Sequence, residues 1–132
     1  MVATDEEIAA VASIALLHSS RSPTDHPWAG LPLRDLIELT DYRRIRAGLS
    51  ESAFQRWLAP RWRIQNQWLD WCDDKRTSSG FYVGQESRAP NHWVIGSIGS
   101  EEQTAHRTKS EAIAAYILRE LDFWSTRPNA RT

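Results

Sequence analysis

Hydrophobic side chains recur at helical spacing along the first half of the chain. Over residues 5–19 they line one face, and Thr4 followed by Glu7 predicts a capping box at the start of a helix. Residues 33–47 predict a second helical segment, whose periodicity falters near Thr40, so that two shorter helices are an alternative. The apolar face of the first helix consists of Ile8, Val11, Ala12, Ala15 and Leu16.

The middle of the chain predicts two more helices separated by a proline. Ser50 is a preferred N-cap residue before a helix over residues 51–58, and Pro60 suits the first turn of a following helix that reaches about Lys75. Apolar side chains cover more than half of the circumference of this later helix, which predicts a central helix of the core. Its apolar residues are Trp62, Ile64, Trp68, Leu69, Trp71 and Cys72.

The pattern changes to short β-branched and aromatic runs from residue 80 onward. Residues 81–84 and 93–98 predict an antiparallel pair of strands, and residues 103–107 predict a third strand. Thr108 is then placed to cap a final helix. The apolar face of that helix consists of Ile113, Ile117, Leu121 and Trp124.

These elements predict a single α+β domain over residues 1–132, with N-terminal helices followed by a small antiparallel sheet of two or three strands and a C-terminal helix. A sheet of this size cannot bury itself, so it must pack its apolar face on the helices. We expect a helical part at about 5–76, a β-β-(β)-α part at about 80–125, and a frayed tail over 126–132.

Composition indicates a bacterial protein of the cytoplasm. The net charge is −1, and the single cysteine, Cys72, excludes an intrachain disulfide. The N-terminus is acidic where a signal peptide would be basic, and no apolar run is long enough to cross a membrane. Fourteen of the sixteen basic residues are arginine, which is typical of a GC-rich genome.

Four of the seven tryptophans fall within fifteen residues. Trp68 and Trp71 share the apolar face of their helix, so we expect them in the core. Trp57 and Trp62 lie on either side of Pro60 among arginines, a composition typical of protein interfaces. The expected partner-binding residues in this segment are Trp57, Trp62, Arg56, Arg61 and Arg63.

Charge is unevenly distributed along the helical half. Six arginines and one acidic residue lie between Tyr42 and Arg63, which indicates either solvated helix faces or a patch for an anionic partner. A second group of candidates is acidic and lies at the C-terminal end of a helix, where the helix dipole disfavours negative charge. It consists of Asp70, Asp73 and Asp74, which with Glu101 and Glu102 could face a basic nuclease.

Nothing in the chain predicts catalysis. The four histidines lack the spacing of metal ligands, although His92 and His106 could lie near each other across the sheet. Cys72 lies on an apolar helix face, as a small buried residue would. The sequence carries no phosphate loop, dinucleotide fingerprint, nucleophile elbow or metalloprotease helix. We therefore expect a protein that is not an enzyme and needs no cofactor or metal.

The segment from about residue 42 to 71 resembles the helix-turn-helix of repressor-type DNA-binding proteins. It departs from that pattern at Gln55 and at Ala59-Pro60, where the motif has a small residue and a glycine turn. The resemblance rests on Gly48-Leu49-Ser50, Phe54, Leu58 and Trp68. It implies a second helix in the major groove. The candidates for contacting bases and phosphates would then be Arg61, Arg63, Gln65 and Asn66.

The second half of the chain resembles small bacterial immunity proteins, which accompany polymorphic or contact-dependent inhibition toxins. The likeness spans roughly residues 68–124. It rests on the Lys75-Arg76 and Ser79-Gly80-Phe81-Tyr82-Val83 segment, Trp93-Val94-Ile95-Gly96, and the closing Ser110-Glu111-Ala112-Ile113-Ala114 helix. The resemblance implies a protein partner, a cognate toxin whose active site is covered by stoichiometric binding. DNA binding by the helix-turn-helix-like segment is the alternative.

Overall fold

The structure, a computed structural model, describes residues 2–19, 26–74, 80–86 and 89–126. Residues 127–132 of the expected tail, and the end of the expected helix at Lys75, lie outside the described residues. The elements are α1 (Asp5–Ala12), α2 (Ile14–Ser19), α3 (Leu33–Leu39), α4 (Tyr42–Ala47), α5 (Glu51–Leu58), α6 (Trp62–Asp74), β1 (Phe81–Glu86), β2 (Ala89–Ser97), β3 (Gln103–His106) and α7 (Lys109–Thr126).

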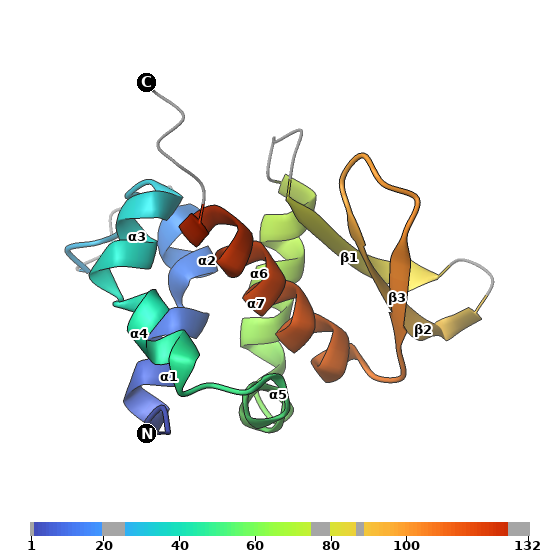
Figure 1. Ribbon diagram of the computed structural model, residues 1–132, viewed down its shortest axis with the longest axis horizontal. Helices are drawn as coiled ribbons and strands as arrows, with labels where there is room; N and C mark the ends of the chain where they lie inside the picture. The colour runs from blue at the N-terminus through green and yellow to red at the C-terminus, as the bar shows by residue number, and fades with distance from the viewer. Residues whose placement is uncertain (1, 20–25, 75–79, 87–88, 127–132) are drawn as a thin grey trace.

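The arrangement confirms an α+β fold with helices first, then a three-stranded antiparallel sheet in the order β1-β2-β3, then a C-terminal helix. Helix α7 crosses the middle of the molecule, with α1 to α4 on one side and the sheet on the other (Figure 1). No helix of the described part is long and apolar enough to cross a bilayer.

The expected first helix is two helices that meet at Ser13. The capping box is confirmed, since the Glu7 amide donates to the Thr4 hydroxyl (3.1 Å) and the Thr4 amide donates to the Glu7 carboxylate (2.9 Å). The Ser13 hydroxyl donates to the Ala10 carbonyl at 2.7 Å, a bond that competes with the helical ladder. The break rotates the following residues, so Leu17 is buried whereas Leu16, expected on the apolar face, is 51% exposed.

The segment from residue 33 to 47 is also two helices, which confirms the alternative drawn from its faltering pattern. Asp41 takes a left-handed conformation with φ +59°, and this residue ends the helical path. The Thr40 hydroxyl donates to the Leu36 carbonyl at 2.7 Å and is thereby satisfied within the core.

The central helix is α7, whereas the sequence predicts α6 in that place. Residues 112–118 of α7 are all buried, so its burial extends around the whole circumference and beyond the stripe expected from Ile113 to Trp124. The three alanines at 112, 114 and 115 let neighbouring elements approach closely on the remaining faces. Helix α6 instead buries one side, through Gln65, Trp68 and Trp71, and exposes the other.

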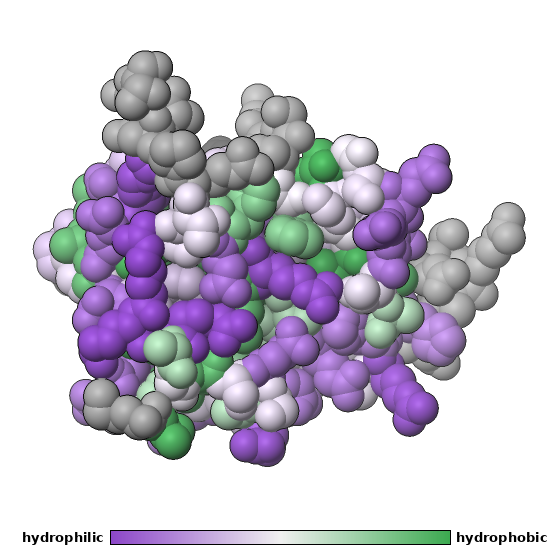
Figure 2. Space-filling view, in the orientation of Figure 1, coloured by the Kyte–Doolittle hydropathy of each residue, from purple (hydrophilic) through white to green (hydrophobic). Residues whose placement is uncertain are grey.

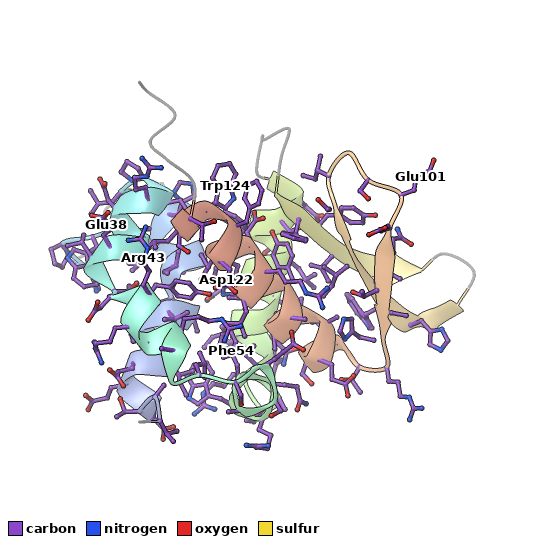
Figure 3. All side chains as sticks on the ribbon, viewed as in Figure 1. Glu38, Arg43, Phe54, Glu101, Asp122 and Trp124 are labelled. Carbon is purple, nitrogen blue, oxygen red and sulfur yellow. The ribbon has the colours of Figure 1, made fainter. Side chains whose placement is uncertain are left out.

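Helices α4 and α7 are joined by polar contacts along their seam. The Tyr42 hydroxyl donates to the Asp122 carboxylate at 2.6 Å, and Arg46 reaches the same carboxylate at 3.3 Å. The Arg43 guanidinium donates to the Ser125 carbonyl near the end of α7 (Figure 3). Burial and the adjacent Asp122 raise the pKa of Tyr42 far above its ordinary value, so this phenol remains a donor. The surface over α4 and the adjoining part of α7 is accordingly hydrophilic (Figure 2).

The sheet packs one face on α7. Val83 pairs with Ile95, and both are buried on the face that meets the helix. His106 pairs with Trp93. Because side chains alternate along a strand, His92 and His106 point to opposite faces of the sheet, so they do not form the expected neighbouring pair.

Glu120 links α7 to the start of β1. Its side chain is fully buried and accepts a hydrogen bond from the Phe81 amide at 2.7 Å. Gly80, just before the strand, has φ +100°, and a Cβ there would lie 2.5 Å from the Glu120 carboxylate oxygen. The glycine is thus required by both the backbone conformation and the space.

We expect truncation of Ile117 to destabilise the domain far more than truncation of Leu16. Ile117→Ala removes a fully buried side chain of α7 and should lower the free energy of unfolding by about 2–5 kcal/mol. Leu16→Ala removes a half-exposed side chain and should cost well under about 1 kcal/mol. Urea denaturation followed by circular dichroism measures both, and equal losses would contradict the central position of α7.

Replacement of Gly80 tests the contact with Glu120. Gly80→Ala should lower the free energy of unfolding by roughly 2–4 kcal/mol, since it adds a steric clash to a strained backbone. Gly99→Ala is the matched control, because Gly99 also has a positive φ (+90°) but open space around it. Thermal denaturation of the two variants should show the larger loss for Gly80, and a larger loss at Gly99 would count against the clash.

Candidate functional site

The turn between α5 and α6 is fixed by a buried glutamine. Gln65 is 4% exposed, and its amide donates to the Leu58 carbonyl at 2.7 Å, at the end of α5. The Arg61 amide donates to the same carbonyl at 2.8 Å. These bonds satisfy a helix end that would otherwise lack partners, and they hold the two helices at a set angle. Helix α6 begins at Trp62, two residues after Pro60.

Two arginine–tryptophan pairs lie at this turn, which we call the α5–α6 corner. The guanidinium carbon of Arg61 lies 4.1 Å from the ring centre of Trp57, and that of Arg63 lies 5.3 Å from Trp62. Arg61 also donates to the Trp57 carbonyl at 2.5 Å. Such cation–π contacts limit the freedom of both side chains. The corner consists of Arg56, Trp57, Arg61, Trp62 and Arg63.

The structure separates the two tryptophans that the sequence places together as interface residues. Trp62 is 59% exposed. Trp57 is half-buried against the core and stacks on Phe54 with ring centres 6.3 Å apart. Its indole N–H is buried without a hydrogen-bond partner among the described residues. Trp57 therefore anchors the corner to the core, whereas Trp62 is the aromatic side chain that a partner can contact.

The six clustered arginines also divide into two groups. Those of α4 are engaged: Arg43 with Ser125, Arg44 with Glu7 and Asp41, and Arg46 with Asp122. The other three, Arg56, Arg61 and Arg63, are exposed and pair with no carboxylate of the described residues. Sequence alone could not separate these groups, because the partners other than the neighbouring Asp41 come from α1 and α7.

The acidic candidates lie at the opposite end of α6. Asp70 and Asp73 are exposed and form no ion pair with another described residue, whereas the side chain of Asp74 lies outside what the structure describes. Glu101 is not part of this group, since it lies after β2 and away from α6 (Figure 3). Glu102 follows it directly in the chain.

A hollow of about 440 Å³ lies beside these aspartates. Its apolar lining residues include Leu16 and Trp71. The sequence pattern predicts Leu16 on the buried face of a continuous helix. Ser13, at which the helix breaks three residues earlier, is the one residue in the sequence that could have indicated its exposure. The remaining lining residues are Ala15, Ser19, Gln67, Asp70 and Asp73.

Trp68 and Trp71 belong to the core, as the sequence predicts. Trp68 is fully buried, and its indole N–H donates to the Ala12 carbonyl at 2.9 Å. The Trp71 ring meets it edge-on, with ring centres 5.5 Å apart. These two rings tie α6 to α1 and α2, and they leave the opposite side of α6 free.

The helix-turn-helix resemblance fits the local geometry in part. Helices α5 and α6 are joined by three residues, and Phe54, Leu58 and Trp68 are fully buried between them and the rest of the core. Gln65, however, is buried at the turn and cannot contact a base. The Lys109 ammonium donates a hydrogen bond to the side-chain oxygen of Asn66. Only Arg61 and Arg63 remain exposed among the expected DNA-contacting residues.

The described residues include no group of three histidine, cysteine, aspartate or glutamate side chains that could hold a metal ion. Cys72 is half-buried next to Tyr116. Burial is the main cause that raises the pKa of the Tyr116 phenol, and the nearby Glu120 and Cys72 raise it further. The phenol therefore stays protonated. The arrangement at the α5–α6 corner and at the hollow is suited to binding, through exposed indole, guanidinium and carboxylate groups.

Comparison of the chain with protein-family models, with curated proteins and with solved structures finds no significant match.

Proposed function

We propose that this chain is a non-catalytic binding protein of the immunity type, which neutralises a cognate toxin in the bacterial cytoplasm by stoichiometric binding. The observation that supports it most is the α5–α6 corner, where Trp62 is 59% exposed beside arginines that pair with no carboxylate of the described residues. Tryptophan and arginine are the residues most often found as hot spots of protein interfaces.

The charge of the corner favours an acidic protein surface as the partner. Exposed guanidinium groups attract carboxylates over a distance and then form two-pronged hydrogen bonds with them. The Arg63–Trp62 contact holds the indole in place before binding, so less side-chain freedom is lost on association. A toxin whose active site is covered by this corner would be blocked without any chemical step.

Trp62→Ala should weaken binding of the cognate toxin domain about thirtyfold or more, because a truncated hot spot costs at least about 2 kcal/mol. The toxin to use is the C-terminal region of a large secreted protein encoded beside this gene. Isothermal titration calorimetry measures the affinity and stoichiometry. Growth of cells that produce the toxin, with and without this chain, measures protection.

Leu39→Ala is the matched control, since Leu39 is an exposed hydrophobic residue (46%) on α3. It should leave affinity and protection unchanged. A toxin domain that is neither bound nor neutralised would contradict the proposed function. Binding that is insensitive to Trp62→Ala in a folded variant would exclude the corner as the binding surface.

DNA binding by α5 and α6 is the second candidate. The three-residue turn and the exposed Arg61 and Arg63 favour it. The exposed carboxylates of Asp70 and Asp73 on the same helix would repel the phosphate backbone. The Gln65 amide is buried at the turn and the Asn66 side-chain oxygen accepts from Lys109, so base recognition also loses contacts that the sequence predicts. We therefore favour the protein partner.

The salt dependence of duplex DNA binding separates these two candidates. A DNA-binding protein loses affinity steeply with salt, and Arg61→Ala or Arg63→Ala should each reduce the slope by about one unit. The protein-partner proposal predicts no measurable binding to duplex DNA at low salt by fluorescence anisotropy. Tight binding whose slope falls in both variants would support the DNA candidate instead.

A further inference from the structure

One face of α6 is exposed along the whole helix and changes charge from end to end. We call it the α6 stripe, and it consists of Trp62, Arg63, Asn66, Gln67, Asp70 and Asp73, all exposed or half-exposed. These positions share one side at a helical period of 3.6 residues. The basic and aromatic end is separated from the acidic end by about 16 Å, at 1.5 Å per residue.

The charges of the stripe oppose the dipole of their own helix. The first turn of α6 has no acidic residue and the last turn has no basic one, so Arg63 lies near the positive end and Asp73 near the negative end. The dipole of a neighbouring antiparallel helix would instead interact favourably with these charges. Its negative end would lie beside Arg63, and its positive end would lie beside Asp70 and Asp73.

We propose that the stripe binds a second copy of this chain, with the two α6 helices antiparallel about a twofold axis between Asn66 and Gln67. The pattern is self-complementary under this axis, because Arg63 of each copy lies opposite Asp70 of the other. Such a pairing is isologous and closed, as in most homodimers. Arg63 and Asp70, which form no ion pair with another described residue, then each gain an oppositely charged partner from the second copy.

Trp62 and Leu69 supply the apolar part of this interface. Under the same axis, Trp62 of one copy lies between positions 69 and 73 of the other, on the edge of the stripe that faces away from the hollow. Leu69 is half-buried, and Trp62 is one of four large hydrophobic residues that are exposed in the described part. The pairing would cover the Trp62 ring of each copy.

This inference stands apart from the proposed function, since it depends only on the α6 stripe. The two are linked in one respect, because the dimer covers Trp62 and would compete with a toxin for the α5–α6 corner. Dimerisation is measured on the chain alone, whereas toxin binding is measured with the toxin domain present, so failure of one proposal is distinguishable from failure of the other.

Charge reversal within the stripe tests the pairing. Arg63→Asp and Asp70→Arg should each weaken dimerisation at least about a hundredfold, because each reversal creates two like-charge contacts across the axis. The double variant Arg63→Asp/Asp70→Arg restores opposite charges and should dimerise again. Sedimentation equilibrium over a wide concentration range gives the dissociation constants, and circular dichroism confirms that each variant is folded.

Glu101→Arg is the matched control, with the same change of charge on an exposed residue beyond β2, and it should dimerise like the unmodified chain. A chain that is monomeric at every concentration overturns the proposal. So does a dimer insensitive to both single reversals, or a folded double variant that stays monomeric. Rescue by the double variant is the result that a merely structural role of either residue would not produce.

Discussion

Burial of α7 on all sides is the interaction on which the rest of the structure depends. The helix separates the N-terminal helices from the sheet and supplies the apolar surface that both need. A sheet of three short strands has too little surface to be stable alone, and helices of six to eight residues are marginal in water. Each becomes stable because α7 provides the other half of its core.

The position of α6 follows from this arrangement. Since α7 occupies the centre, α6 packs only through the side that carries Gln65, Trp68 and Trp71. Its other side is left for charges and for Trp62. The buried Gln65 amide, which caps the end of α5, fixes where this exposed side points. Core packing thus determines which side of α6 forms the candidate binding surface. The same tryptophan-rich segment contributes side chains both to the core and to that surface.

Much of the fold could be predicted from local patterns. The capping box at Thr4, the N-cap at Ser50 and the alternation in β1 and β2 are signals that neighbouring residues carry by themselves. Which helix lies at the centre was mispredicted. Helix α6 is rich in tryptophan, whereas α7 owes its full burial to alanines that look neutral in a sequence.

The candidate site was predicted less well, because it depends on contacts between distant segments. The arginines of α4 differ from those of the α5–α6 corner in that Asp122, Ser125 or Glu7 lies within their reach. Likewise, Trp57 and Trp62 have similar neighbours in the chain, and only packing against Phe54 distinguishes them. Leu16 is exposed because the helix breaks at Ser13, and the helical spacing of apolar residues does not predict that break.

The central helix is also the element that the ribosome makes after all the other described elements. At synthesis rates of about 5–20 residues per second, the α1 to α6 segments wait several seconds without the surface that would cover them. The apolar faces that pack on α7, including that of α5 with Phe54, are open to chaperones and to other nascent chains during that interval. We therefore expect the domain to fold as a unit once residues 109–126 are available, and not progressively from its N-terminus.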